Sequence, residues 1–225
     1  MSLPIIHGTC CTSVCFFYNL STLTISVPTR RIRYMTSPSE DRLFIAVPLA
    51  ESAKQLVSGW RQELESSGLR FQKWLHSADY HITLKFIGNT PASTLPELAP
   101  LLAAAASSHP PLRLSAAGTG TFGPKDAPSI LWAGVQGDLD ALQALQRDVE
   151  AACASLGFEP EDRPYRPHIT LARRYSGGLH WTRELLPAPG DLPSASWEAD
   201  KIAVYRTHMG RSPMYERAAD FELRG

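Results

Sequence analysis

The sequence predicts a domain of the α plus β class, made of two lobes in one continuous body. From Arg42 onward, short β-rich runs alternate with helical stretches, and Pro or Gly clusters separate them. Hydrophobic residues make up 44% and charged residues 20% of the 225 residues, which is the composition of an ordinary globular protein. Because no low-complexity linker divides the body, we expect residues 35–225 to form one bilobal domain.

Hydrophobic periodicity assigns the elements in order. Strands are expected at residues 43–47, 71–75, 80–87, 112–116, 130–135, 168–172, 197–205 and 219–223. Helices are expected at residues 49–66, 95–107 and 139–156, and glycines soon after the first and third are typical of helix ends. Trp60, Trp74 and Trp132 lie in apolar periodic runs, so we expect all three in the core.

The first 34 residues differ from the body. Residues 1–29 contain no Lys, Arg, Asp or Glu, and an apolar patch at 13–20 is preceded by no basic residue and followed by no clean small-residue cleavage site. The fit to a signal peptide is therefore weak, and the patch is too short and too polar to span a bilayer. A polar lead and a strand-like run follow Met35. We expect Met35 to be the natural start and residues 1–34 to be disordered or non-native.

Charge and cysteine content restrict the partners and the setting. From Tyr34 the chain holds 19 basic and 22 acidic residues. This balance does not favour binding to long double-stranded nucleic acid, but it is compatible with binding one phosphate at the end of a nucleic-acid chain. Three of the four cysteines lie in the first fifteen residues, and Cys153 is alone in the body. No disulfide framework is possible there, so we expect a reducing, cytoplasmic interior. We also expect no membrane association and a monomer.

A repeated tetrapeptide carries the chemistry. His81-Ile82-Thr83-Leu84 and His168-Ile169-Thr170-Leu171 lie 87 residues apart. Side chains alternate faces along a strand, so each segment is expected to turn its Ile and Leu, with Phe86, to a core and its His and Thr to the other face. If an approximate twofold relates the lobes, the two polar faces meet in a groove.

Such a groove suits in-line phosphoryl transfer. One group must take a proton from water on one side of phosphorus, and another must protonate the leaving oxygen on the other side. Two histidines provide both near neutral pH, because an unperturbed imidazole titrates around pH 6.5. The hydroxyls of Thr83 and Thr170 are candidate donors to the non-bridging oxygens.

The wider context of each motif resembles a known family. RLFIAV at 42–47, HITLKFIG at 81–88 and RPHITLAR at 166–173 are similar to the two-histidine (2H) phosphoesterase superfamily, and within it to the RNA 2',3'-cyclic phosphodiesterase branch, also called LigT-like or 2'-5' RNA ligase. The resemblance covers roughly residues 42–223. It implies a bilobal fold with sheets lining a central cleft and helices outside, no metal or other cofactor, and hydrolysis of RNA 2',3'-cyclic phosphate ends, or of small cyclic nucleotides, to 2'-phosphates.

The resemblance also implies roles for single residues. His81 and His168 would be catalytic, and Thr83, Thr170 and Arg173 would bind the substrate phosphate. Strict alternation from His168 places Arg174 rather than Arg173 on the histidine face, unless the strand ends or twists after Leu171.

Other residues near the motifs have open interpretations. Phe122 and Tyr165 are candidates for stacking on a base, although core packing or a turn explains them equally well. Lys85 shares the parity of His81 and is a candidate for attracting phosphate. A zinc site would need a third protein ligand, for which Asp79 is the candidate.

Two other functions stay open at this point. The first is 2'-5' phosphodiesterase or RNA ligase activity on another nucleotide phosphoester. The second is a non-catalytic RNA-end binding module that keeps the cleft without turnover.

Overall fold

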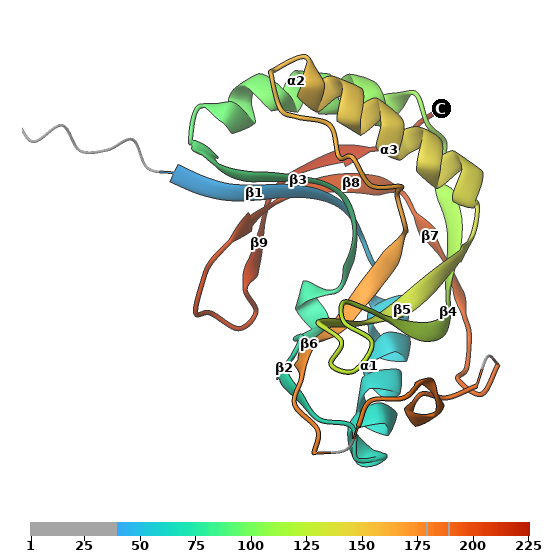
Figure 1. Cartoon of the computed structure of the whole chain (residues 1–225). Coiled ribbons are helices and arrows are strands. Elements are labelled where there is room, and N and C mark those ends of the chain that lie inside the picture. The colour runs from blue at the N-terminus through green and yellow to red at the C-terminus, as the bar shows by residue number, and fades with distance from the viewer. Residues whose placement is uncertain (1–39, 179, 189) are drawn as a thin grey trace, which may run out of the picture. The chain divides into compact units, whose positions relative to one another are not determined.

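The computed structural model describes residues 40–178, 180–188 and 190–225 (Figure 1). The expectations about residues 1–34 and Met35 lie outside the described residues. Everything below concerns the compact unit Ser37–Gly225. Among the described helices, none has both the length and the apolar character needed to cross a bilayer.

The described residues form one curled sheet of nine strands in the order β7-β4-β5-β6-β3-β1-β8-β9, and β2 adds to β6. All strand pairs are antiparallel. The strands are β1 (Glu40–Pro48), β2 (Phe71–Trp74), β3 (His81–Pro91), β4 (Leu112–Phe122), β5 (Ile130–Gly137), β6 (His168–Tyr175), β7 (Ser196–Ala199), β8 (Lys201–Thr207) and β9 (Tyr215–Glu222).

The sheet has two halves that meet at the motif strands. β3 and β6 pair only through Ile82 and Ile169, so the sheet is narrowest between the two histidine segments. One half holds β3, β1, β8 and β9, and the other holds β6, β5, β4, β7 and β2. The two lobes expected from the sequence are these halves, which places one motif at the inner edge of each.

Three helices cover the outer face of the curled sheet within the described residues (Figure 1). α1 (Glu51–Ser66) packs against β4 and β7, and α2 (Thr94–Ser107) lies beside α3 (Leu139–Ala154) over β9 and β3. The apolar stripe of α1 contributes Ala53, Val57, Trp60 and Leu64 to the core. Alternation along β1 separates the two faces, because Leu43, Ile45 and Val47 enter this core.

The inner, concave face has a smaller apolar cluster made of Phe44, Ala46, Ala203 and Tyr205. The ring centroid of His81 lies 4.7 Å from that of Phe44, so the first motif histidine is on this concave face. The predicted separation of an apolar core face from a histidine face is therefore confirmed for Ile82 and Leu84 of β3, but not for Phe86.

The α plus β class and the three helices agree with the sequence prediction, and two details were wrong. The run 197–205 is two strands rather than one: β7 pairs with β4, whereas β8 pairs with β1 in the other half. A continuous run of strand-forming residues does not reveal a change of partner. Trp132 is half-buried, not in the core, because it lies across from Thr170 on the histidine face of β5, and Trp74 is half-buried as well.

Candidate active site

His81 opens β3, directly after the short 3-10 helix η1 (Ser77–Asp79). Its Nδ1 lies 2.7 Å from the Asp79 carbonyl oxygen, and its Nε2 lies 3.1 Å from the Thr83 hydroxyl. A carbonyl oxygen only accepts, so Nδ1 carries the proton of the neutral ring and Nε2 presents its lone pair. Both partners of the ring, Asp79 and Thr83, lie only two residues away along the chain.

His168 repeats this arrangement in the other half of the sheet. Its Nδ1 donates to the Arg166 carbonyl oxygen at 2.7 Å, again two residues upstream. In the neutral rings, Nε2 of each histidine is thus the unprotonated nitrogen that can accept a proton. Two imidazoles in the same tautomer, offered from opposite strands, are suited to exchange protons with a group held between them.

A β-bulge follows each motif at the same position. On β3, Thr83 and Lys85 pair with successive residues of β1, so Leu84 is the extra residue. On β6, Thr170 and Ala172 pair with successive residues of β5, so Leu171 is the extra residue. Each bulge reverses the alternation beyond it.

The bulge after Thr170 returns Arg173 to the histidine face. Leu171 and Ala172 are both fully buried, Arg173 is half-buried, and Arg174 is exposed with a φ of 58°. Arg173 also acts electrostatically on both imidazoles. The doubt that strict alternation raised about Arg173 is thereby removed.

The equivalent bulge on β3 overturns the expectations for Lys85 and Phe86. Lys85 is 4% exposed; its Nζ lies 2.8 Å from Glu150 Oε2 and also donates to the Glu159 carbonyl. Phe86 turns away from the core, is 62% exposed, and lines the cleft. Lys85 therefore ties β3 to α3 and to the segment before β6, and its charge is already paired.

We expect Lys85→Met to lower the free energy of unfolding by about 3 kcal/mol, because it leaves Glu150 half-enclosed without its cation. Lys54→Met is the matched control: Lys54 pairs with the exposed Glu51 at 3.7 Å, and such a surface pair contributes about 0.5 kcal/mol. Urea denaturation of both variants measures the difference. An equal, small loss in both variants would contradict a structural role for the buried pair.

Asp79 does not share the face of His81. Its carboxylate accepts the backbone N–H of Met214 at 3.0 Å and of Tyr215 at 3.1 Å, and it is 3% exposed. The zinc alternative thus loses the third ligand that it required. No other group of three His, Cys, Asp or Glu side chains suited to a metal occurs within residues 40–178, 180–188 and 190–225.

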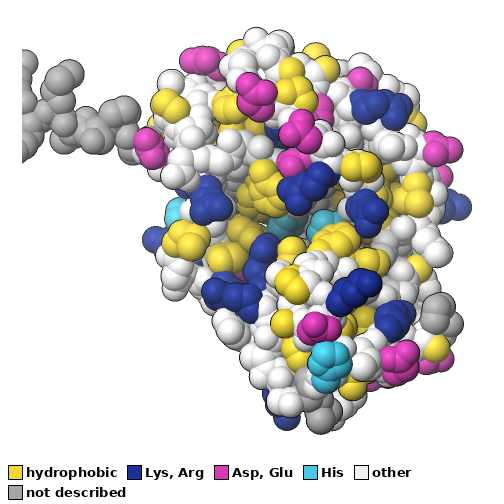
Figure 2. All heavy atoms as spheres, viewed as in Figure 1, with side chains coloured by type: hydrophobic (Ala, Val, Ile, Leu, Met, Phe, Trp, Pro, Cys, Tyr) yellow, Lys and Arg dark blue, Asp and Glu magenta, His cyan; other side chains and the backbone are white. Residues whose placement is uncertain are grey.

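The motif side chains line one cleft of about 780 Å³. Figure 2 shows a hollow with histidine at its base and Lys or Arg side chains gathered around it. The structure brings together the residues predicted for catalysis, phosphate binding and base stacking: His81, Thr83, Phe122, Tyr165, His168, Thr170 and Arg173. A single groove thus contains both imidazoles, both hydroxyls and the Arg173 guanidinium.

The two nominated aromatic residues lie differently in this cleft. The ring of Phe122 meets His168 edge-on at 4.9 Å and tilts against Trp132 at 5.4 Å. The ring of Tyr165 packs against the main core, and burial raises the pKa of its hydroxyl. Phe122 therefore supports an imidazole from the side, and stacking on a base stays a prediction for both.

Two other contributors to the site were not predicted from the sequence. Tyr215 of β9 meets the His81 ring edge-on at 5.2 Å and lines the cleft, and Phe44 packs on the same imidazole. Both come from strands other than β3. Only the pairing of β1, β8 and β9 brings them to His81, so no local pattern was available to find them.

Burial is the largest cause of the pKa shifts of His81 and His168. It lowers the pKa of His81 to about 4, and the charges of Arg173 and His168 act in the same direction against the hydrogen bond to the Asp79 carbonyl. Burial, assisted by Arg173, also lowers the pKa of His168. Both shifts favour the neutral rings in the free protein, whereas a bound anion would favour protonation of one of them.

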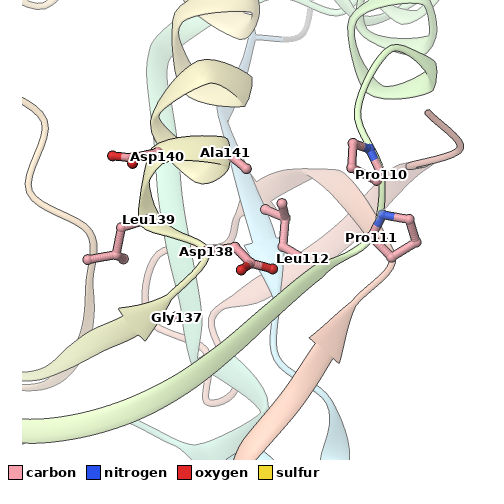
Figure 3. Close-up of a pocket in the computed structure, with 8 residues that line it drawn as sticks. All are labelled: Pro110, Pro111, Leu112, Gly137, Asp138, Leu139, Asp140 and Ala141. Carbon is pink, nitrogen blue, oxygen red and sulfur yellow. The ribbon is translucent and has the colours of Figure 1, made fainter.

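A second hollow, shown in Figure 3, lies between the α2–β4 connection and the start of α3. It encloses about 470 Å³ and is lined by Pro110–Leu112 and Gly137–Ala141. Its Asp138 carboxylate accepts the Arg113 backbone N–H at 2.8 Å. No histidine, lysine or arginine lines this hollow, so the acid-base chemistry belongs to the first cleft.

Comparisons with known proteins agree with this geometry. The model of the 2'-5' RNA ligase superfamily matches residues 48–211. A Geobacillus stearothermophilus protein named RNA 2',3'-cyclic phosphodiesterase is 45% identical over 81% of this chain, which spans 57% of that relative's length. A Bacillus subtilis protein of the same name is 31% identical over 80% of this chain and 95% of its own length.

Solved structures show the same fold. A Thermus thermophilus protein superposes with a TM-score of 0.65 at 27% identity, covering 82% of this chain and 98% of its own. E. coli LigT, crystallised with 3'-AMP, superposes with a TM-score of 0.67 at 22% identity, covering 83% of this chain and all of its own. With the family model matching most of the described residues, the chain belongs to the 2'-5' RNA ligase superfamily of two-histidine phosphoesterases.

Proposed function

We propose that this chain hydrolyses RNA 2',3'-cyclic phosphate ends to 2'-phosphomonoesters without a metal. The observation that carries the proposal is the pair of imidazoles, His81 and His168, held in the same tautomer on facing strands of one cleft. The names of the Geobacillus and Bacillus relatives support the choice of substrate.

The reaction needs two proton movements across one phosphorus atom. Water attacks phosphorus as one Nε2 takes a proton from it, and the bond from phosphorus to the 3'-oxygen breaks as the other Nε2 gives that oxygen a proton. The product is a 2'-phosphomonoester with a free 3'-hydroxyl. When the anionic phosphate binds, one imidazole takes up a proton from solvent at Nε2 and serves as the acid, while the other stays neutral and serves as the base. Either histidine can take either role, since both present Nε2 to the cleft.

Arg173 and the two threonines stabilise the charge that develops on the non-bridging oxygens. Arg173 offers a guanidinium, whose planar donors match phosphate oxygens. Thr83 donates to His81 in the free protein. On substrate binding, its hydroxyl turns to a phosphate oxygen and leaves Nε2 free to exchange a proton.

A substrate panel tests the proposal. With EDTA present, we expect turnover of 2',3'-cyclic AMP and of a cyclic-ended oligonucleotide, and phosphorus NMR should show the 2'-phosphate. Loss of turnover on chelation would instead indicate a metallosite. Turnover of 2'-5' oligoadenylate alone would favour the 2'-5' phosphodiesterase or ligase alternative, and binding without turnover would favour the RNA-end binding module.

The pH dependence of kcat/KM is expected to be bell-shaped and centred below pH 6.5. One histidine must be protonated and the other neutral, and in the free protein the pKa of His81 lies at about 4 with that of His168 lowered as well. Activity therefore falls as pH rises through the higher of the two values and falls again below the lower one. A profile that stays flat from about pH 5 to 9 would contradict the pairing.

We also propose a cellular location and an oligomeric state for this chain. Cys153, the only cysteine in the described residues, is free and buried, which supports a reducing, cytoplasmic location. We also propose that the chain acts as a monomer, since each histidine is supplied by the same chain. Size-exclusion chromatography with light scattering checks this, and a dimer mass would contradict it.

A further inference from the structure

Three arginines that line the cleft have no role in the proposed phosphate chemistry, and we call them the arginine wall. Arg147 of α3, and Arg163 and Arg166 of the segment between α3 and β6, line the same cleft as the catalytic histidines, and all three are exposed. Arg163 pairs with Glu161 at 3.2 Å, but its side chain is 88% exposed, and so open a pair is readily exchanged for another anion. In the described part of the chain, no ion pair involves Arg147 or Arg166.

The cleft is richer in basic side chains than residues 40–225 as a whole. Five Lys or Arg side chains and two Glu side chains line it, whereas residues 40–225 as a whole hold 19 Lys or Arg and 22 Asp or Glu. The glutamates are Glu161 and Glu150, and the latter is already paired with Lys85. Figure 2 shows several basic side chains around the hollow. A positive cleft with low-dielectric walls concentrates an anionic ligand there.

The segment that presents Arg163 and Arg166 is held in place on both sides of them. Lys85 Nζ donates to the Glu159 carbonyl, and His168 Nδ1 donates to the Arg166 carbonyl. Between these points the Tyr165 ring packs into the core. The two guanidiniums are therefore offered by an anchored segment, which reduces the ordering cost of binding an anion.

We propose that Arg147, Arg163 and Arg166 bind the phosphodiester that precedes the cyclic end. This inference rests on the proposed function and names its substrate class: a single-stranded oligonucleotide with a cyclic end, in preference to a cyclic mononucleotide. Arg173 and the threonines hold the reacting phosphate, and the arginine wall holds the next one along the chain. A mononucleotide fills the catalytic end of the cleft and leaves this wall unused.

The test compares kcat/KM for 2',3'-cyclic AMP and for a cyclic-ended tetraadenylate. We expect the wild type to prefer the tetranucleotide on the order of tenfold or more, the worth of one charge-assisted phosphate contact. Arg147→Gln, Arg163→Gln and Arg166→Gln together should remove this preference and leave the mononucleotide rate within about twofold. The combined variant should also reduce the salt dependence of log kcat/KM for the tetranucleotide by about 0.7, the slope for one phosphate of a single strand.

Arg113→Gln is the matched control, because Arg113 is exposed on β4 and outside the cleft lining. It should leave both rates and the salt slope unchanged. Equal rates for the two substrates in the wild type, or an equal loss on both in the combined variant, would overturn this inference alone. A wild type that turns over neither substrate would overturn the proposed function and this inference with it.

Discussion

Replacing either His81 or His168 by alanine is expected to lower kcat/KM for 2',3'-cyclic AMP by about 10³ to 10⁴, near the upper limit for general acid-base assistance. One ring acts as the general base and the other as the general acid, and a single imidazole cannot serve both roles in the same step. The double variant should be little worse than the single ones, because residues that act as a unit are not additive. Initial rates over a range of substrate concentrations measure both effects.

His109→Ala controls for the loss of a buried imidazole as such. His109 and His81 are both 9% exposed, but His109 pairs with Asp148 at 2.7 Å and lies outside the cleft lining. Its activity per folded molecule should remain within about twofold of wild type, since it contacts no reacting atom. Retention of more than about a tenth of the activity in either motif variant would contradict the acid-base pair.

Arg173→Gln is expected to lower kcat by about 10² to 10³, the usual effect of removing one preorganised donor to a developing anion. The glutamine fills the same space on β6 but brings no positive charge to the cleft. Arg174→Gln is a stringent control, because Arg174 is the neighbour that strict alternation placed on the histidine face and it is exposed. That variant should keep kcat within about twofold.

The pH profile separates an electrostatic role of Arg173 from a merely structural one. Arg173 lowers the pKa of both His81 and His168, so its removal should raise both values. Both limbs of the kcat/KM profile should then move to higher pH in Arg173→Gln, whereas Arg174→Gln should reproduce the wild-type profile. A loss of rate with no movement of either limb would count against the electrostatic role.

Much of the site is local in origin and was predictable for that reason. In each motif the alternation of a strand separates His and Thr from Ile, and the imidazole Nδ1 donates to a carbonyl only two residues upstream. Hydrophobic periodicity likewise located the three helices to within a few residues. These features depend on neighbours along the chain, which a sequence contains in full.

The errors share a single cause, which is strand pairing. Whether Lys85 faces the cleft or α3 depends on a bulge opposite β1, and the position of Arg173 depends on a bulge opposite β5. The carboxylate of Asp79, the candidate third ligand of a zinc site, is held away from His81 by the backbone N–H groups of Met214 and Tyr215. The single run 197–205 was divided because its two parts pair in different halves of the sheet.

By itself, the sequence determined the chemical groups and the alternation of His, Ile and Thr within each motif, because those properties are set within a few residues. The tertiary structure alone decided that the two histidines share one cleft, that Arg173 joins them, and that Lys85 is withdrawn into an ion pair. The physical reason is that register, bulges and burial depend on which strand lies alongside, and that partner is chosen by packing across the whole sheet.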